Sequence, residues 1–236
     1  VNAGNSIASG GNYNVVVGDE AGTAITTGDY NTAVGYQALS TEDTTNTSTA
    51  IGYRALKAQN ADADSFNTAV GHDAGLSVTT GLYNVLVGGN AGDALTDADR
   101  NVAVGVGALG SDTKGNKATA VGQGALGTQN FSSSTDNYNV AIGFEAGNDI
   151  TTGVNNTLIG GLAGDAITTG SSNAALGYNS LGLNTTGARN VAMGAESLSA
   201  NTTGADNVAI GEDALTANTT ASNNTAVGTD SLKANT

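Results

Sequence analysis

The sequence has no cysteine, no proline and no tryptophan, and aromatic residues make up only 4% of its 236 positions. So few bulky side chains cannot pack the broad core of an ordinary globular domain, and the core must be thin and repeated along an axis. One histidine, His72, without any cysteine excludes a His/Cys metal cluster, and no nucleophile elbow is present for a Ser-His-Asp triad. We therefore expect no enzyme activity, no cofactor and no metal.

Long apolar runs and basic residues are also scarce. No run approaches the roughly 18 residues of a membrane span, and no charged-then-apolar leader is present at the N-terminus. Asp and Glu number 21 against 7 Lys and Arg, and the net charge of -14 repels phosphate backbones and anionic membranes. We expect neither nucleic acid nor membrane as a partner. This composition is also typical of disorder, but regular apolar columns argue against it.

What the sequence contains is a repeat. A unit of the form N-x-A-V-G-x-x-A-(L/G) recurs thirteen times, and ten of the twelve intervals are 17 residues. The other two intervals, of 19 and 21 residues, carry their additional residues in the polar second half, around Asp62 to Phe66 and Phe131 to Asp136. The units begin at Asn14, Asn31, Ser48, Asn67, Asn84, Asn101, Ala118, Asn139, Asn156, Asn173, Asn190, Asn207 and Asn224.

The repeat excludes helices, because TTG, NTTG and regularly placed glycines interrupt every stretch with a 3.6-residue period, and glycine costs about 1 kcal/mol in a helix interior. Short strands, corners and polar turns remain. We predict an all-β fold, a parallel β-solenoid (β-roll or β-helix) of about thirteen 17-residue turns. It forms one domain over residues 1–236, with a partial turn at 1–13, twelve turns over 14–223 and a partial turn at 224–236.

Repeat position 5, counted from the first residue of each unit, is always glycine. Such strict placement indicates either a corner with positive φ or a close backbone approach that a Cβ would block. The predicted corner glycines are Gly18, Gly35, Gly52, Gly71, Gly88, Gly105, Gly122, Gly143, Gly160, Gly177, Gly194, Gly211 and Gly228.

The apolar positions predict which side chains line the core. Position 4 is always a medium-sized apolar residue, such as Val17 or Ile142, and position 2 is mostly Val or Thr. The two positions share one face of a short strand, which we expect to be the core face. Position 8 is a small residue that suits a tight interior bend. Position 9 is Leu in eight units, and the other five have Gly there with an apolar residue at position 12, so each turn keeps one further apolar anchor.

Position 1 is asparagine in eleven units. In stacked turns about 4.8 Å apart, these side chains are expected to form an amide ladder, each bonding to the next. The alternative is that asparagine simply favours turns. The predicted ladder residues are Asn14, Asn31, Asn67, Asn84, Asn101, Asn139, Asn156, Asn173, Asn190, Asn207 and Asn224.

Position 3 lies on the opposite strand face and is apolar too. A strand that is apolar on both faces is usually buried on both, so we expect position 3, at residues such as Val16, Ala33, Leu86 and Leu158, to meet another copy of the chain. A trimer or lateral filament contacts satisfy this, and the alternative is tolerated exposure of alanine. The chain starts at Val1 and stops within a turn at each end without a cap, which indicates end-to-end stacking or a piece of a longer protein.

The phrases NTAVGYQAL (31–39), NVAMGAESLSANTTG (190–204) and NVAIGEDALTANTTA (207–221) resemble the N-T-A-x-G-Y-x-A-L-x-x-N-T-T-G arrays of phage tail-fibre and bacterial surface proteins. They are more distantly similar to the head β-rolls of trimeric autotransporter adhesins, whose unit is shorter. The resemblance covers nearly the whole chain. It implies an extracellular, cell-surface or virion location, fibre formation and attachment, without a catalytic site.

Several apparent motifs are discarded. GVGALG (Gly105 to Gly110) and GQGALG (Gly122 to Gly127) match the dinucleotide fingerprint, but their first glycine is the position-5 glycine and no helix is expected after it. Acidic residues such as Asp97 lack the spacing of calcium β-rolls. Aromatic residues recur just before position 1 and at position 6, where they either stack on one another or form an interface or glycan-binding surface.

We therefore expect a structural subunit of an extracellular or virion filament or fibre, a rigid and self-associating β-solenoid. The alternative is an adhesin or phage receptor-binding fibre whose loops, at the two insertions, recognise a host surface or glycan. Ice binding is a third hypothesis, because threonine pairs such as Thr168-Thr169 recur, but adjacent threonines in a strand point to opposite faces.

Overall fold

The computed structural model describes residues 2–235, and it contains strands and turns without a helix in that range. Val1 and Thr236, the outermost residues of the two predicted partial turns, lie outside the described residues. The chain falls into two compact units, the first comprising residues 2–118 with Phe131–Asp136, and the second Thr119–Asn130 with residues 137–235. The prediction of one domain over 1–236 stays a prediction.

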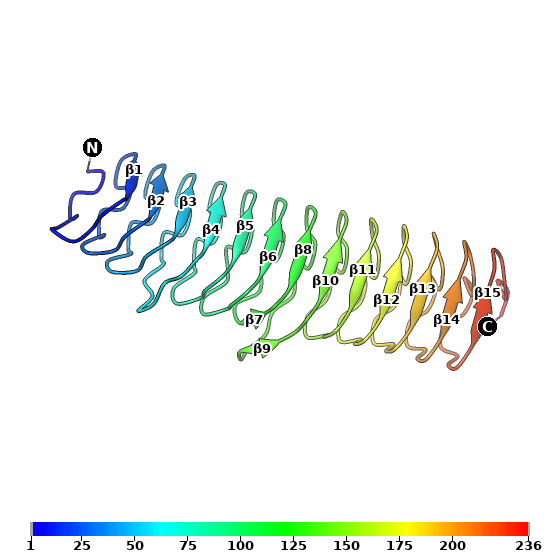
Figure 1. Ribbon diagram of the computed structural model, residues 1–236. Coiled ribbons are helices and arrows are strands. Elements are labelled where there is room, and N and C mark those ends of the chain that lie inside the picture. Colours follow the sequence, from blue (N-terminus) through cyan, green and yellow to red (C-terminus); the bar gives the residue numbers. More distant parts are fainter. Residues whose placement is uncertain (1, 236) are drawn as a thin grey trace. The chain divides into compact units, whose positions relative to one another are not determined.

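Each unit contains a parallel ladder of three-residue strands (Figure 1). Those of the first unit are β1 (Val15–Val17), β2 (Thr32–Val34), β3 (Thr49–Ile51), β4 (Thr68–Val70), β5 (Val85–Val87) and β6 (Val102–Val104), with the short strands β7 (Gly115–Asn116) and β9 (Thr135–Asp136) beside them. Those of the second unit are β8 (Thr119–Val121), β10 (Val140–Ile142), β11 (Thr157–Ile159), β12 (Ala174–Leu176), β13 (Val191–Met193), β14 (Val208–Ile210) and β15 (Thr225–Val227).

Equal repeat positions are Cα partners in both ladders. Val16 pairs with Ala33 between β1 and β2, and Leu158 pairs with Ala175 between β11 and β12. The strands therefore stack in parallel and in register, and the predicted fold class is confirmed: the chain is an all-β solenoid of about thirteen turns, each about 17 residues long.

The glycine at position 5 ends each strand. All thirteen of these glycines have a positive φ, between 121° and 145°. A Cβ on Gly18 would lie 2.6 Å from the carbonyl oxygen of Gly35 in the next turn. Both physical reasons for glycine therefore apply at this corner, since the backbone conformation is left-handed and the next turn leaves no room for a side chain.

The remainder of each turn is bends rather than a second long strand. Non-glycine residues adopt positive φ at positions 7, 9 and 17, as in Glu20 (56°), Leu39 (51°) and Tyr30 (61°). This conformation is unfavourable for L-residues. Hydrogen bonds between solenoid turns hold it in place: the backbone N–H of Leu39 donates to the carbonyl of Ala55 at 3.0 Å.

The structure corrects which strand face is the core. Leu86, Leu158 and Ala33 at position 3 are fully buried, and Val16 is half-buried. In contrast, Val15 and Val17 at positions 2 and 4 are 51% and 56% exposed. The predictions that positions 2 and 4 form the core column, and that Val16, Ala33, Leu86 and Leu158 form a self-association face, are therefore wrong.

Interior volume explains this error. Alternation along the strand separates the two faces correctly, but the inside of one turn is narrow and is already filled by the anchors at positions 9 and 12. Leu39 and Ile25, one of each kind, are fully buried. A Cβ on Gly92 at position 9 would lie 2.7 Å from Leu86 and 2.9 Å from Leu95. Position 3, which is alanine in ten of the thirteen units, therefore points inward, and the medium-sized apolar residues at position 4 point outward.

The longer insertion folds back onto the first unit. Strand β9 pairs in parallel with β7, Thr135 opposite Gly115, and Phe131 is almost fully buried. The buried carboxylate of Asp112 accepts hydrogen bonds from the backbone N–H groups of Gly115 (3.0 Å) and Phe131 (3.2 Å). The insertion is thus an ordered element with a fixed base.

Candidate functional site

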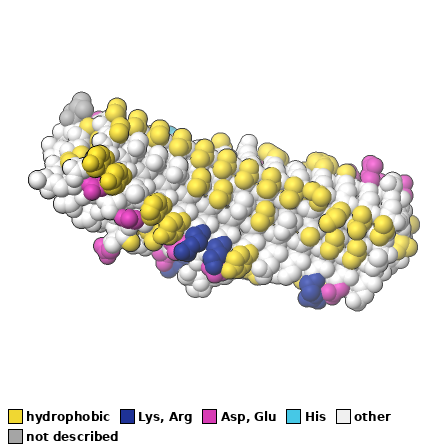
Figure 2. Space-filling view, in the orientation of Figure 1, with side chains coloured by type: hydrophobic (Ala, Val, Ile, Leu, Met, Phe, Trp, Pro, Cys, Tyr) yellow, Lys and Arg dark blue, Asp and Glu magenta, His cyan; other side chains and the backbone are white. Residues whose placement is uncertain are grey.

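The side chains at positions 2 and 4 form a surface that we call the outward strand face. Its residues are hydrophobic or threonine, none is charged, and exposure reaches 67% at Val227. Figure 2 shows hydrophobic side chains in rows on the face that it draws. The face comprises Val15, Val17, Thr32, Val34, Thr49, Ile51, Thr68, Val70, Val85, Val87, Val102 and Val104 in the first unit, and Thr119, Val121, Val140, Ile142, Thr157, Ile159, Ala174, Leu176, Val191, Met193, Val208, Ile210, Thr225 and Val227 in the second.

Charged side chains lie elsewhere on the turns. Arg54 forms an ion pair with Asp73 at 2.6 Å, from position 7 of successive turns. Arg189 pairs with Asp206 at 2.6 Å, from position 17 of successive turns. Most of the negative charge is unpaired, because acidic residues outnumber basic ones threefold. The outward strand face itself carries no charged side chain.

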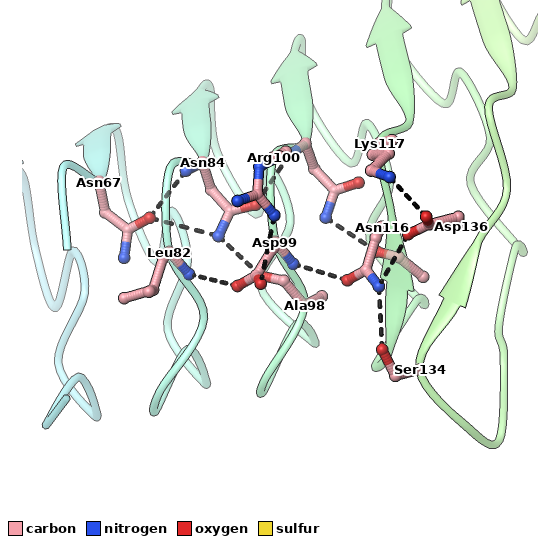
Figure 3. Close-up of polar contacts among 12 residues, drawn as sticks. Asn67, Leu82, Asn84, Ala98, Asp99, Arg100, Asn116, Lys117, Ser134 and Asp136 are labelled. Atoms are coloured by element: carbon pink, nitrogen blue, oxygen red, sulfur yellow. Dashed lines mark hydrogen bonds and ion pairs between the residues drawn. The ribbon is translucent and has the colours of Figure 1, made fainter. Parts of the chain in front are cut away.

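The predicted asparagines bond along the solenoid (Figure 3). The backbone N–H of Asn101 donates to the side-chain oxygen of Asn84 at 2.9 Å, and the Asn84 amide donates to the carbonyl of Ala98 at 2.8 Å. Direct amide-to-amide bonds also occur, as from Asn190 to Asn173 at 3.2 Å. Each buried side chain thus satisfies its own loop and the next turn, which is the arrangement of a ladder.

A second buried ladder at position 12 was missed by the sequence analysis. The Asn201 amide donates to Asn184 at 2.8 Å, and the Asn218 amide donates to Asn201 at 3.0 Å. A signal was available, because position 12 is polar in every unit whose position 9 is leucine. The fully buried polar residues at position 12 are Glu42, Gln59, Asp112, Gln129, Asn184, Asn201 and Asn218.

A third series joins position 16 of neighbouring turns in the first unit (Figure 3). The backbone N–H of Leu82 donates to Asp99 at 2.8 Å, and that of Asp99 donates to Asn116 at 2.8 Å. The Asn116 amide donates in turn to the Ser134 hydroxyl at 2.9 Å. This series connects the insertion to the regular turns.

Aromatic side chains stack along the turns, which confirms that interpretation for these rings. Tyr13 and Tyr30 lie 5.0 Å apart at an interplanar angle of 6°. Tyr53 stacks between Tyr36, at 5.5 Å, and His72, at 4.8 Å. Stacked rings cover one another's faces, so these residues offer mainly ring edges to a sugar.

Two carboxyl groups have shifted pKa values. Hydrogen bonds from Arg54, at 2.8 and 2.6 Å, hold the pKa of Asp73 below its usual value. Burial raises the pKa of Asp165, whose Oδ1 has no hydrogen-bond partner. Asp73 belongs to the first unit and Asp165 to the second.

Within residues 2–235 there is no pocket and no group of three or more His, Asp or Glu placed to hold a metal ion. The same part of the chain has no helix suited to crossing a bilayer. No protein-family model, curated protein or solved structure matches this chain.

Proposed function

We propose that this protein is a structural subunit of an extracellular or virion fibre, and that copies associate through the outward strand face. The observation that carries the proposal is the uncharged, largely apolar surface repeated on all thirteen three-residue strands. At about 3.3 Å per residue and about 4.8 Å between strands, the six three-residue strands of the first unit cover about 300 Å², and the seven of the second unit cover about 350 Å². Each area is already that of the largest apolar patch on a typical monomer, about 300–600 Å².

The partner that we propose is a second copy of the same chain. A copy with net charge -14 is repelled over most of the surface, and the outward strand face carries no charge. Its rows of side chains repeat with every turn, and only a partner with the same repeat can fill them along their whole length. The likeness of the repeats to fibre proteins supports the same proposal and the location outside the cell.

Sedimentation velocity of the purified chain tests this association. The wild type is expected to sediment as an oligomer, and the double variant Met193→Lys with Ile210→Lys as a monomer, because two charges would be buried without partners. Thr186→Lys with Thr203→Lys adds the same charge at exposed positions away from the face, and this control should remain oligomeric. A monomeric wild type, or an oligomeric face variant, would contradict the proposal.

Recognition of a host surface or glycan is a second candidate, favoured by the 131–136 insertion. Ser132, Ser133 and Ser134 are exposed at the tip, while Phe131 and the β7–β9 pairing hold its base. Screening of host cells and glycans, with the three serines replaced by glutamate, tests it: binding that disappears on replacement supports recognition by this loop, and unchanged binding excludes it.

A further inference from the structure

Five polar side chains meet in the interior of the first unit around Gln59. Glu42, Ser48, Gln59, Ser65 and Asn67 are all fully buried. The amide nitrogen of Gln59 lies 2.5 Å from the Ser48 hydroxyl oxygen, 3.1 Å from the Ser65 hydroxyl oxygen and 3.2 Å from a Glu42 carboxylate oxygen. A primary amide has two N–H donors. The Gln59 amide nitrogen therefore has three close oxygen neighbours but only two hydrogens to donate.

Gln59 has a structural role in the asparagine ladder. Ser48 begins a unit without the usual asparagine, and Gln59 restores the ladder by accepting the Asn67 amide N–H at 2.9 Å. The second unit provides the comparison, where Gln129 accepts the Asn139 amide N–H at 2.7 Å.

The two long units differ in their hydroxyl-bearing residues. At the repeat positions that correspond to Ser48 and Ser65, the other long unit has Ala118 and Asn137. Neither of these two residues carries a hydroxyl group, so the pair of buried serines distinguishes the unit of Gln59 from the other long unit. Both serines are nucleophiles held against the Gln59 carboxamide.

We propose that Ser48 and Gln59 form an intramolecular ester with release of ammonia. The Ser48 oxygen attacks the side-chain carbonyl carbon of Gln59, an O–C bond forms, and the bond from that carbon to Nε2 breaks. The hydroxyl proton passes to the Ser65 oxygen, 2.6 Å away, which gives its own proton to Nε2. Ammonia leaves, and atoms and electrons balance without an oxidant or reductant.

The neighbouring groups fit this reaction. The Asn67 amide, which donates to Gln59 Oε1, stabilises the negative charge that develops on that oxygen. Glu42 holds the departing nitrogen, and its other oxygen is fixed by the backbone N–H groups of Asp43 (3.1 Å) and Thr45 (2.8 Å). Full burial keeps the reactants in contact and keeps water from hydrolysing the ester.

The mass of the intact full chain under denaturing, neutral conditions tests the ester. We expect a mass about 17 Da below that of the sequence, which corresponds to one ammonia lost in nucleophilic acyl transfer. Trypsin cleaves after Arg54 and Lys57, between the two linked residues, so the ester should join the peptide that ends at Arg54 to the peptide that begins at Ala58. Hydroxylamine should separate them.

Ser48→Ala should retain the full sequence mass, and Ala118 at the equivalent position shows that the fold accepts alanine there. Ser132→Ala, a control at an exposed serine, should lose ammonia as the wild type does. An unmodified wild-type mass overturns the proposal without any variant. So does an ammonia loss that persists in Ser48→Ala, or a link confined to the peptide from Ala58 that joins Gln59 to Ser65.

Discussion

The side-chain oxygen of Asn156 accepts the backbone N–H of Asn173, the equivalent residue of the next turn, at 3.0 Å. Its amide donates to the carbonyl of Gly170, at the other end of its own turn, at 2.9 Å. One side chain therefore closes its own turn and positions the next. This explains why the position that begins the repeat tolerates so little variation within the chain.

Asn173→Ala is expected to destabilise the fold by about 3 kcal/mol, because buried polar groups without partners cost about 1–3 kcal/mol each. The variant leaves the backbone N–H of Asn190 without its side-chain acceptor, and the carbonyl of Gly187 keeps only the Asn184 amide as a side-chain donor. Chemical denaturation measures the change. Thr169→Ala, at an exposed position, is the control and should change stability by less than about 0.5 kcal/mol.

Gly160→Ala and Gly161→Ala should behave very differently although the residues are adjacent. Gly160 has φ of 139°, and an added Cβ would lie 2.6 Å from the carbonyl carbon of Gly177. Gly161 has no positive φ, and its nearest atom would be 3.8 Å away, on the Tyr178 ring. We expect the first variant to lose at least about 3 kcal/mol and the second to be nearly neutral. Similar unfolding midpoints for the two would refute the corner role.

Leu158→Ala tests which strand face is interior. Leu158 is fully buried, so its truncation should cost about 2–5 kcal/mol. Ile142→Ala removes a comparable volume from the outward strand face, where the side chain is 39% exposed, and should cost less than half as much in the unassociated protein. Denaturation at low protein concentration measures the stability of the two variants. A larger loss of stability for Ile142→Ala than for Leu158→Ala would contradict the inward orientation of position 3.

Asp73→Asn should remove a stabilising interaction that depends on pH. Because the pKa of Asp73 is lowered in the folded state, its contribution is present above its unfolded value near 3.8 and is lost as pH falls through the folded value. The variant is therefore less stable than wild type at pH 7, and the difference should shrink below about pH 4. Thermal unfolding over this range measures it, and a constant difference would exclude the linkage.

Asp165→Asn should change the stability at pH 7 in the opposite direction to Asp73→Asn. Burial raises the pKa of Asp165, so the ionised group opposes folding at neutral pH and ceases to do so once it is protonated below its unfolded value near 3.8. The variant should be more stable than wild type at pH 7 and similar to it in acid. The same thermal series decides this, since a variant less stable at pH 7 would show that the carboxylate is stabilising.

The one-dimensional pattern of the sequence determined the architecture. Thirteen glycines at a fixed position and an asparagine at the head of most units leave stacked parallel turns as the arrangement that places like residues together. The two long intervals also identified where Asp62 to Phe66 and Phe131 to Asp136 depart from the regular turn. Each inference rests on local steric and hydrogen-bonding rules, which act wherever the residue occurs.

Only the tertiary structure decided which way the strands face. Alternation assigns Ile142 and Leu158 to opposite faces, but it carries no information about how wide the inside of a turn is. Side chains from the bends, such as Leu39 and Ile25, fill that space, and the apolar residue at position 4 therefore faces outward. The contacts among Glu42, Ser48, Gln59 and Ser65 likewise arise only when successive turns stack, because they join residues up to 17 positions apart in the chain.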